Sequence, residues 1–201
     1  SVPPQSITIL GQALNTNGYI YKVLSDNDTE IVTPQVKGVD HYTFGESQQK
    51  YHCQFTAFVD MPDPPPGHND RVGWDFGHAW WCLSSDAPSE ALSQFGATSE
   101  QIHFCNEEVG YADHGWPIWG GLLRDPETDQ NKTVTKSYDI GFPGLLAGLA
   151  YTQNIHDNPG TYDVLLNNCV QHVVAAGAAA GVSLPHDTKP ETFGWDLINS
   201  Q

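Results

Sequence analysis

The chain has 201 residues, a formal net charge of −16 at pH 7, and 39% hydrophobic residues. Its length and its 11% aromatic content predict one globular domain over residues 1–201 rather than a disordered chain. With 24 acidic and only 8 basic side chains, a basic face for binding nucleic acid or an anionic membrane is excluded. No apolar run reaches the length of a membrane span. This balance is typical of a secreted or exported protein.

Residues 1–50 predict a β-rich N-terminal extension, because short apolar runs alternate there with turn-forming residues. Strands are expected at residues 6–10, 19–24, 30–36 and 41–44. The run YHCQFTAFVDM, residues 51–61, predicts a core strand that ends at the Pro-rich loop 62–70. The run GHAWWCLSS, residues 77–85, predicts the next strand.

The second half of the chain changes from strands to helices. Residues 101–109 predict an antiparallel partner for the preceding strand, and residues 111–133 predict an irregular aromatic segment. Helices are expected over 142–156 and 169–180, each followed by Gly and Pro residues that end it. The expected fold class is α+β, an antiparallel sheet packed against a Cys-bearing helix, with the core in residues 51–190.

The chain has four cysteines and no Cys-x-x-Cys pair, so neither a structural zinc site nor another bound metal is expected. Cys53, Cys82 and Cys105 lie in strand-like runs and are expected to be buried thiols or to form one disulfide. Cys169 alone lies at a predicted helix start. The acidic turn SDNDTE lacks the ligand spacing of an EF-hand, so calcium is not expected either.

The stretch YDVLLNNCVQHV places a polar Asn-Asn-Cys where an apolar run becomes a helix. Asn167 or Asn168 is suited to cap the helix, which puts Cys169 in its first turn. Free N–H groups and the helix dipole favour negative charge there, so they favour the nucleophilic thiolate. The small residues 175–180 would let the helix pack closely on a sheet. The alternative is a buried structural cysteine beside a capping pair.

A thiolate nucleophile needs a base, normally histidine, within hydrogen-bond reach. The chain has nine histidines. His78 is the strongest candidate because it opens a predicted strand directly after Gly77 and precedes a hydrophobic run. The alternative is a half-buried sheet histidine that bonds a backbone carbonyl.

GHAWWCL followed much later by YDVLLNNCVQHV resembles the circularly permuted NlpC/P60 family of papain-like cysteine peptidases. The resemblance covers about Phe55 to Leu184, and within the family it is strongest to bacterial cell-wall hydrolase effectors of type VI secretion. It implies Cys169 as the nucleophile and His78 as the base. It also implies a permuted papain-like fold that uses no cofactor.

The resemblance further implies that the substrate is the peptide stem of bacterial peptidoglycan, cleaved by an endopeptidase or amidase. Such an antibacterial toxin is secreted or delivered to the periplasm of a target bacterium. An immunity protein and the secretion apparatus are the partners that it implies.

The third catalytic group remains open between His103 and Glu107, which strand alternation places on one face. If residue 84 pairs near residue 101, His78 lies opposite Glu107. A register shifted by four residues brings His103 there instead, and the residue type matches the family better. A plain Cys–His dyad is the remaining alternative.

Other candidates lie beside these motifs. Asn168, next to the thiol, is a candidate substrate contact. Trp116 and Trp119 are candidates for an aromatic substrate wall, with core or lid packing as the alternative. His172 follows Cys169 by one helical turn, and a base on the same helix would point along the axis, so a packing or surface role is expected.

Two other function classes remain open. The first is an acyltransferase or thioesterase on the same scaffold, and the second is a non-catalytic binding module. A thiol-directed alkylator distinguishes an enzyme from a non-catalytic binding module, because an active Cys169 would react far faster than Cys53, Cys82 or Cys105.

Overall fold

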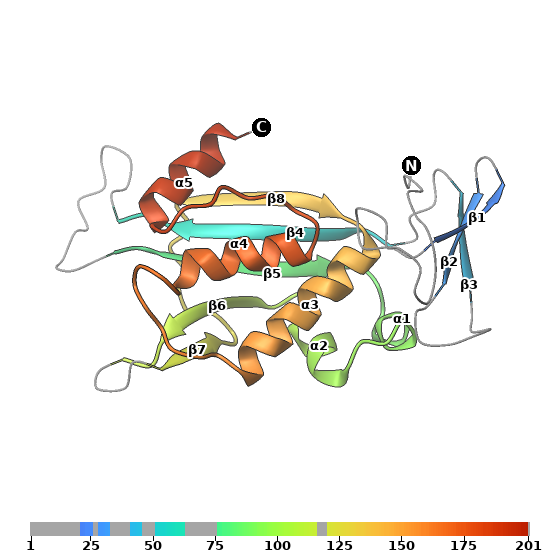
Figure 1. Cartoon of the computed structure of the whole chain (residues 1–201), viewed down its shortest axis with the longest axis horizontal. Coiled ribbons are helices and arrows are strands. Elements are labelled where there is room, and N and C mark those ends of the chain that lie inside the picture. Colours follow the sequence, from blue (N-terminus) through green and yellow to red (C-terminus); the bar gives the residue numbers. More distant parts are fainter. Residues whose placement is uncertain are drawn as a thin grey trace.

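The structure, a computed structural model, describes residues 21–25, 28–32, 41–45, 51–62, 76–115 and 120–200. Figure 1 shows the course of the chain. The strands are β1 (Tyr21–Ser25), β2 (Asp28–Val32), β3 (His41–Gly45), β4 (Cys53–Asp60), β5 (His78–Ser85), β6 (Glu108–Asp113), β7 (Gly121–Arg124) and β8 (Val134–Ile140). The helices are α1 (Ser89–Gln94), α2 (Ser99–Phe104), α3 (Phe142–Asp157), α4 (Cys169–Ala179) and α5 (Pro190–Asn199).

The main sheet has five antiparallel strands in the order β7-β6-β5-β4-β8. Strand β4 lies inside the sheet between β5 and β8, and its residues Phe55, Ala57 and Val59 are fully buried. Its partners are β5, with Asp60 opposite His78, and β8. The α+β class with an antiparallel sheet is therefore confirmed.

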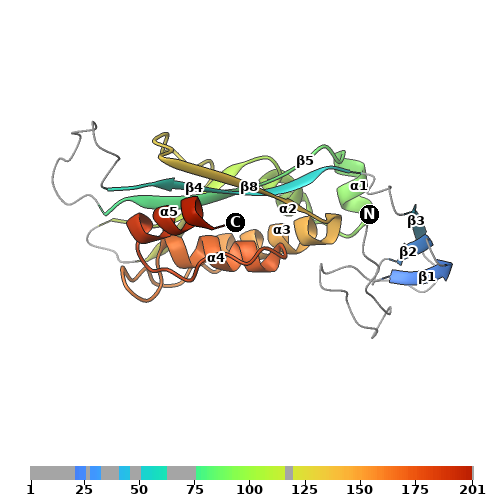
Figure 2. The same ribbon diagram turned by 90° about the horizontal axis from the view of Figure 1, so that it is seen from above.

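Three helices cover one face of this sheet. Figure 2 shows α3, α4 and α5 on the same side of the strands. Gly148 of α3 lies against Leu83 of β5, and Trp81 of β5 donates from Nε1 to the Thr152 hydroxyl of α3 at 3.2 Å. Within the described ranges no helix is both long and apolar enough to cross a membrane.

A separate three-stranded antiparallel sheet forms from β1, β2 and β3. Tyr21 pairs with Ile31, which in turn pairs with Tyr42. This agrees with the strands expected at residues 19–24, 30–36 and 41–44. The strand expected at residues 6–10 lies outside the described residues.

The strand expected over residues 101–109 is wrong. Residues 99–104 form α2, and strand β6 begins only at Glu108. Thr98 and Gln101 form a capping box that starts α2, and Asn106 takes a left-handed φ of 67° that redirects the chain. Strands β7 and β8 and helix α5 were not expected; β7 lies in the segment that was expected to be irregular.

Candidate active site

Cys169 is the first residue of α4 and is only 3% exposed. Asn168 caps the helix, because its Oδ1 accepts from the backbone N–H of Gln171 at 3.2 Å. The Gln171 side chain returns a bond by accepting from the Asn168 N–H at 2.9 Å. This reciprocal pair fixes the helix start, and with it the position of the sulfur.

The buried amide of Asn168 also joins two loops to the helix start. Its Nδ2 donates to the carbonyls of Val164 and Thr188, each at 2.7 Å. With Oδ1 used in the cap, every atom of this amide is bonded to the chain itself. These contacts make Asn168 a residue that positions Cys169; its expected contact with a substrate stays a prediction.

His78 is the first residue of β5, and β5 and α4 begin at the same end of the sheet (Figure 1). Gly77 before it has a φ of 76°, and a Cβ there would collide with the Asp60 carbonyl. Only glycine fits this turn without strain. The Cys169 side chain lies close enough to the His78 imidazole to raise the pKa of that histidine, so the expected proximity of thiol and imidazole is present.

The second partner of His78 is Glu127, which sequence reasoning did not identify. Nε2 of His78 donates to Oε2 of Glu127 at 2.7 Å. The Glu127 side chain is completely buried. Its other oxygen, Oε1, accepts from the N–H groups of Thr128 and Asp129 at 2.8 and 3.1 Å and from Arg124 at 3.2 Å. The carboxylate is therefore held rigidly behind the imidazole.

The neighbours of His78 set its protonation. Burial opposes the imidazolium, but the adjacent Cys169 and the bonded Glu127 outweigh it and raise the pKa of His78 to about 9. Burial alone would raise the pKa of Glu127. The hydrogen bond to His78 and the charge of that imidazolium, with the backbone N–H of Asp129 and the charge of Arg124, instead lower it to about 2. At neutral pH the carboxylate is charged and the imidazole readily holds a proton.

Gly110 of β6 provides the space for the His78–Glu127 pair. A Cβ at this position would overlap the Glu127 carboxylate and come within 3.0 Å of Nε2 of His78. The absence of a side chain at Gly110 is thus required for the Glu127 carboxylate, which lies in the loop after β7, to reach the imidazole.

Neither His103 nor Glu107 lies where the sequence reasoning expected it. His103 is on α2 and its Nε2 bonds Asp125 at 2.7 Å. Cys82 of β5 pairs with Glu108 of β6, so the register between the two strands differs by five residues from the expected one. Glu107 therefore lies toward the end of β5 that is remote from His78. Both expectations depended on a strand where α2 forms, so the polar partner of His78 is Glu127 instead.

Tyr162 also contacts the thiol. Its hydroxyl lies beside both the side chain and the backbone N–H of Cys169. Burial, then the neighbouring sulfur and Asp113, raise the pKa of Tyr162, so the phenol stays protonated. A neutral O–H donor therefore lies beside the N–H group of Cys169.

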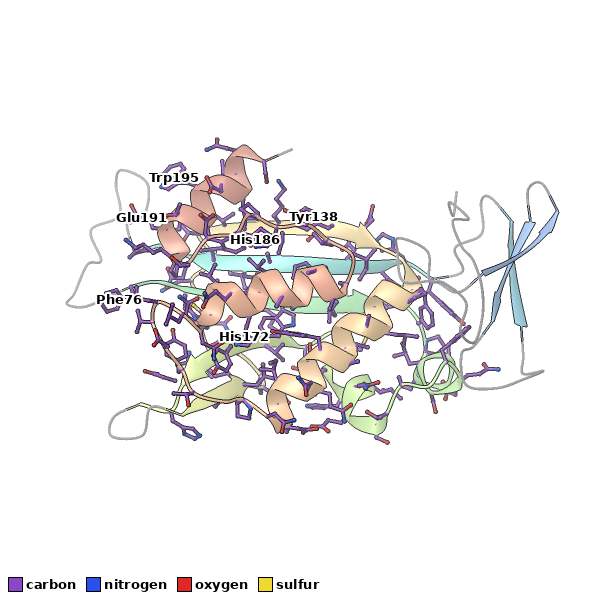
Figure 3. The ribbon with its side chains drawn as sticks, viewed as in Figure 1. Phe76, Tyr138, His172, His186, Glu191 and Trp195 are labelled. Atoms are coloured by element: carbon purple, nitrogen blue, oxygen red, sulfur yellow. The ribbon has the colours of Figure 1, made fainter. Side chains whose placement is uncertain are left out.

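His172 anchors the segment that carries Tyr162. Its Nε2 donates to Asn167 Oδ1 at 2.8 Å, and its Nδ1 accepts from the Tyr151 hydroxyl at 2.6 Å. Burial lowers the pKa of His172 to about 4, so it is neutral. Figure 3 shows His172 on the underside of α4, near β6, where its ring contacts Tyr111 at 4.0 Å between centroids. The expected packing role agrees with these contacts.

Trp116 and Trp119, the candidates for a substrate wall, are outside the described residues. All four cysteines are free, so the disulfide considered for Cys53, Cys82 and Cys105 is not formed. Burial raises the pKa of Cys53 to about 11 and that of Cys82 to about 12.

The described ranges contain one group of three side chains with metal-ligating atoms close together, formed by Glu100, His156 and Asp157. These residues belong to α2 and α3 and are partly or largely exposed. Exposed acidic groups of this kind are common without a metal, and none of the three contacts the Cys169–His78–Glu127 chain.

The two residues that sequence reasoning missed differ in their signals. Tyr162 precedes the Asn-Asn-Cys junction by five residues and is part of the stretch that carried the resemblance. Glu127 lies in the loop between β7 and β8 and is 49 residues from His78, so only the tertiary structure shows the contact.

Comparisons with protein-family models, with curated proteins and with solved structures give no significant match for this chain.

Proposed function

We propose that the protein is a cysteine hydrolase that cleaves amide bonds, with Cys169 as nucleophile, His78 as base and Glu127 as the orienting acid. The alignment of three adjacent groups carries this proposal: the thiol lies beside the imidazole, and the imidazole is hydrogen-bonded to a buried carboxylate. Such an alignment fixes the tautomer of the histidine and stabilises its protonated form.

The proposed reaction begins when the His78 nitrogen facing the sulfur takes the thiol proton. The thiolate of Cys169 attacks the carbonyl carbon, and the C=O electron pair moves to the oxygen. The intermediate collapses as the C–N bond breaks and His78 gives its proton to the leaving amine. Water, deprotonated by His78, then hydrolyses the thioester and releases the acid and the free thiol.

The negative oxygen of the intermediate needs fixed donors. The backbone N–H of Cys169 and the hydroxyl of Tyr162 lie together beside the sulfur. We assign them as the two donors of the oxyanion site, and Tyr162 supplies the further donor that the sequence left unidentified.

The substrate class follows from the resemblance alone. The order of the elements, with the His strand before the Cys helix, supports a permuted papain-like scaffold of the NlpC/P60 type. On that basis the proposed substrate is the peptide stem of bacterial peptidoglycan, and the proposed role is an antibacterial effector acting in the periplasm. An immunity protein and a secretion partner belong to the same proposal.

Digestion of purified peptidoglycan sacculi, with the fragments identified by mass spectrometry, tests this function. The wild-type protein should release fragments with a new carboxyl and a new amine from one bond of the stem, whereas Cys169→Ala should release none. Intact sacculi after treatment with wild-type protein would refute the peptidoglycan substrate. Hydrolysis of simple anilide amides tests the chemistry separately from the substrate.

A further inference from the structure

Exposed apolar side chains gather beside the proposed active site. Within the described ranges, six large hydrophobic residues are exposed. Val164, Leu165 and Leu166 are 50%, 64% and 79% exposed and precede Cys169 by three to five residues, and Phe76, 60% exposed, precedes His78 by two. Four of the six therefore flank the two reacting groups. Apolar surface concentrated around a polar site marks a binding surface.

The turn that carries the three aliphatic residues is rigid. Asp163 and Asn167 exchange both backbone hydrogen bonds, at 2.9 and 3.0 Å. The Asp163 carboxylate accepts from the N–H groups of Leu165 and Leu166 at 2.8 and 2.9 Å. The backbone is thus satisfied within the turn, and the two leucine side chains are held outward in solvent.

Both ends of this turn are fixed at the nucleophile. The Tyr162 hydroxyl lies beside Cys169 at one end, and at the other Asn168 bonds the Val164 carbonyl while capping the helix of Cys169. Only five residues separate the two anchors, so the leucines cannot lie far from the thiol. Phe76 lies at the same end of the sheet (Figure 3).

We propose that Leu165 and Leu166 determine substrate specificity by binding an aliphatic chain on the acyl side of the scissile bond. This inference rests on the proposed function, and it adds the chemical class of the acyl group. The chain is either the side chain of an apolar amino-acid residue or a linear acyl chain, because both present the same methylene surface.

The net charge of the protein favours an uncharged aliphatic chain over a lipid bilayer as the group bound by Leu165 and Leu166. A net charge of −16 repels an anionic membrane surface, whereas an uncharged aliphatic group experiences no such repulsion. Each methylene buried on all sides favours binding by about fourfold, and contact on one side only gives about twofold.

The experiment measures kcat/KM for p-nitroanilides in two series. The first carries acetyl, butanoyl, hexanoyl and octanoyl groups; the second carries N-acetyl-Gly, -Ala, -Val and -Leu. In the wild-type protein kcat/KM should rise about twofold per methylene in the series that matches the natural acyl group. The series with the steeper rise identifies the source of the chain.

Three variants test the assignment to the turn. Leu165→Asn with Leu166→Asn should flatten the rise, because kcat/KM falls on the longer substrates. Leu165→Met with Leu166→Met should preserve it, because Met offers similar apolar area. Trp195→Asn with Ile198→Asn removes apolar groups that are 43% and 52% exposed on α5 and should leave the rise unchanged.

The outcomes separate this inference from the proposed function. If the wild-type protein hydrolyses no anilide and no sacculi, the proposed function fails. If it hydrolyses the acetyl substrate but shows no rise with chain length, or if the double Asn variant keeps the full rise, the specificity role is overturned while the chemistry stands.

Discussion

The carboxylate of Glu127 lies 2.7 Å from Nε2 of His78 across 49 residues of sequence, and its side chain is completely buried. A buried charge is costly unless it is paired and hydrogen-bonded. This one is bonded by an imidazole, an arginine and two backbone N–H groups. The arrangement orients the imidazole and fixes which nitrogen remains free for the thiol.

Glu127→Gln should strongly reduce catalysis. The two N–H groups and Arg124 that face Oε1 will select the amide oxygen, so the amide NH₂ will face Nε2 of His78. His78 must then carry its proton on the nitrogen facing the thiol, which cannot accept another. We expect kcat to fall by about 10²- to 10⁴-fold. The alkaline limb of kcat/KM, set by the His78 pKa of about 9, should move to lower pH.

The matched controls for this prediction are Glu107→Gln and His103→Asn. Both residues were candidates from the sequence, and neither bonds His78 in the structure. Each should keep kcat within about twofold of wild type and leave the alkaline limb unchanged. A large loss in either control, or wild-type activity in Glu127→Gln, would contradict the assignment of the third group.

Gly110→Ala should reproduce part of the Glu127 defect without altering a polar group. The added Cβ overlaps the carboxylate, so Glu127 must withdraw from His78. We expect kcat to fall at least tenfold and overpacking to lower the free energy of unfolding by about 1–3 kcal/mol. Gly148→Ala, which crowds Leu83 away from the site, is the control. It should lose stability and keep the pH profile.

The sequence was sufficient to select Cys169 and His78, the two residues that the structure brings together. Asn168 before Cys169 is a local capping signal, and the structure confirms the capped helix start. His78 could be placed because it opens a strand of strongly hydrophobic residues. Signals of this kind depend on a few neighbouring residues, so they can be read without the tertiary structure.

The third group could not be predicted, because it depends on the register between strands and on a loop. A capping box at Thr98 and Gln101 signals the start of α2, but the apolar residues of 101–109 fit a strand equally well. Because α2 occupies residues 99–104, the expected pairing of residue 84 near residue 101 does not form. Nothing local to Glu127 marks a loop carboxylate that is buried against a distant histidine.

Tyr162→Phe should remove one donor to the oxyanion. We expect kcat to fall by about 10²-fold, the usual cost of one such donor. Because Tyr162 does not bond His78, the alkaline limb should stay in place, which distinguishes this variant from Glu127→Gln. Tyr151→Phe, which removes only the hydroxyl bonded to His172, is the control and should retain most activity. Full activity in Tyr162→Phe would remove it from the oxyanion site.

The His78–Glu127 pair should make stability depend on pH in a defined window. The folded pKa of His78, about 9, exceeds its usual 6.5, so its contribution is complete below 6.5 and is lost as pH rises through 9. The folded pKa of Glu127, about 2, is below its usual 4.5, so its contribution is complete above 4.5 and is lost as pH falls toward 2.

Urea unfolding of the wild type and of His78→Phe checks this window. The difference in unfolding free energy between the two proteins should be largest between pH 4.5 and 6.5. It should shrink toward pH 9 and again toward pH 2. A difference that grows above pH 7 would have the wrong sign and would show that His78 is not held as an imidazolium.

Iodoacetamide at pH 7 should label Cys169 and leave the other thiols largely intact. Burial raises the pKa of Cys53 to about 11 and that of Cys82 to about 12, and it also raises the pKa of Cys105. These thiols are therefore protonated and unreactive. Cys169 lies beside an imidazole that readily holds a proton. A small reagent is needed because Cys169 is only 3% exposed.

Peptide mass spectrometry should find one label per chain, and His78→Ala should slow its incorporation at least tenfold. Labelling that is independent of His78, or equally fast at Cys82, would show that the imidazole does not activate the thiol.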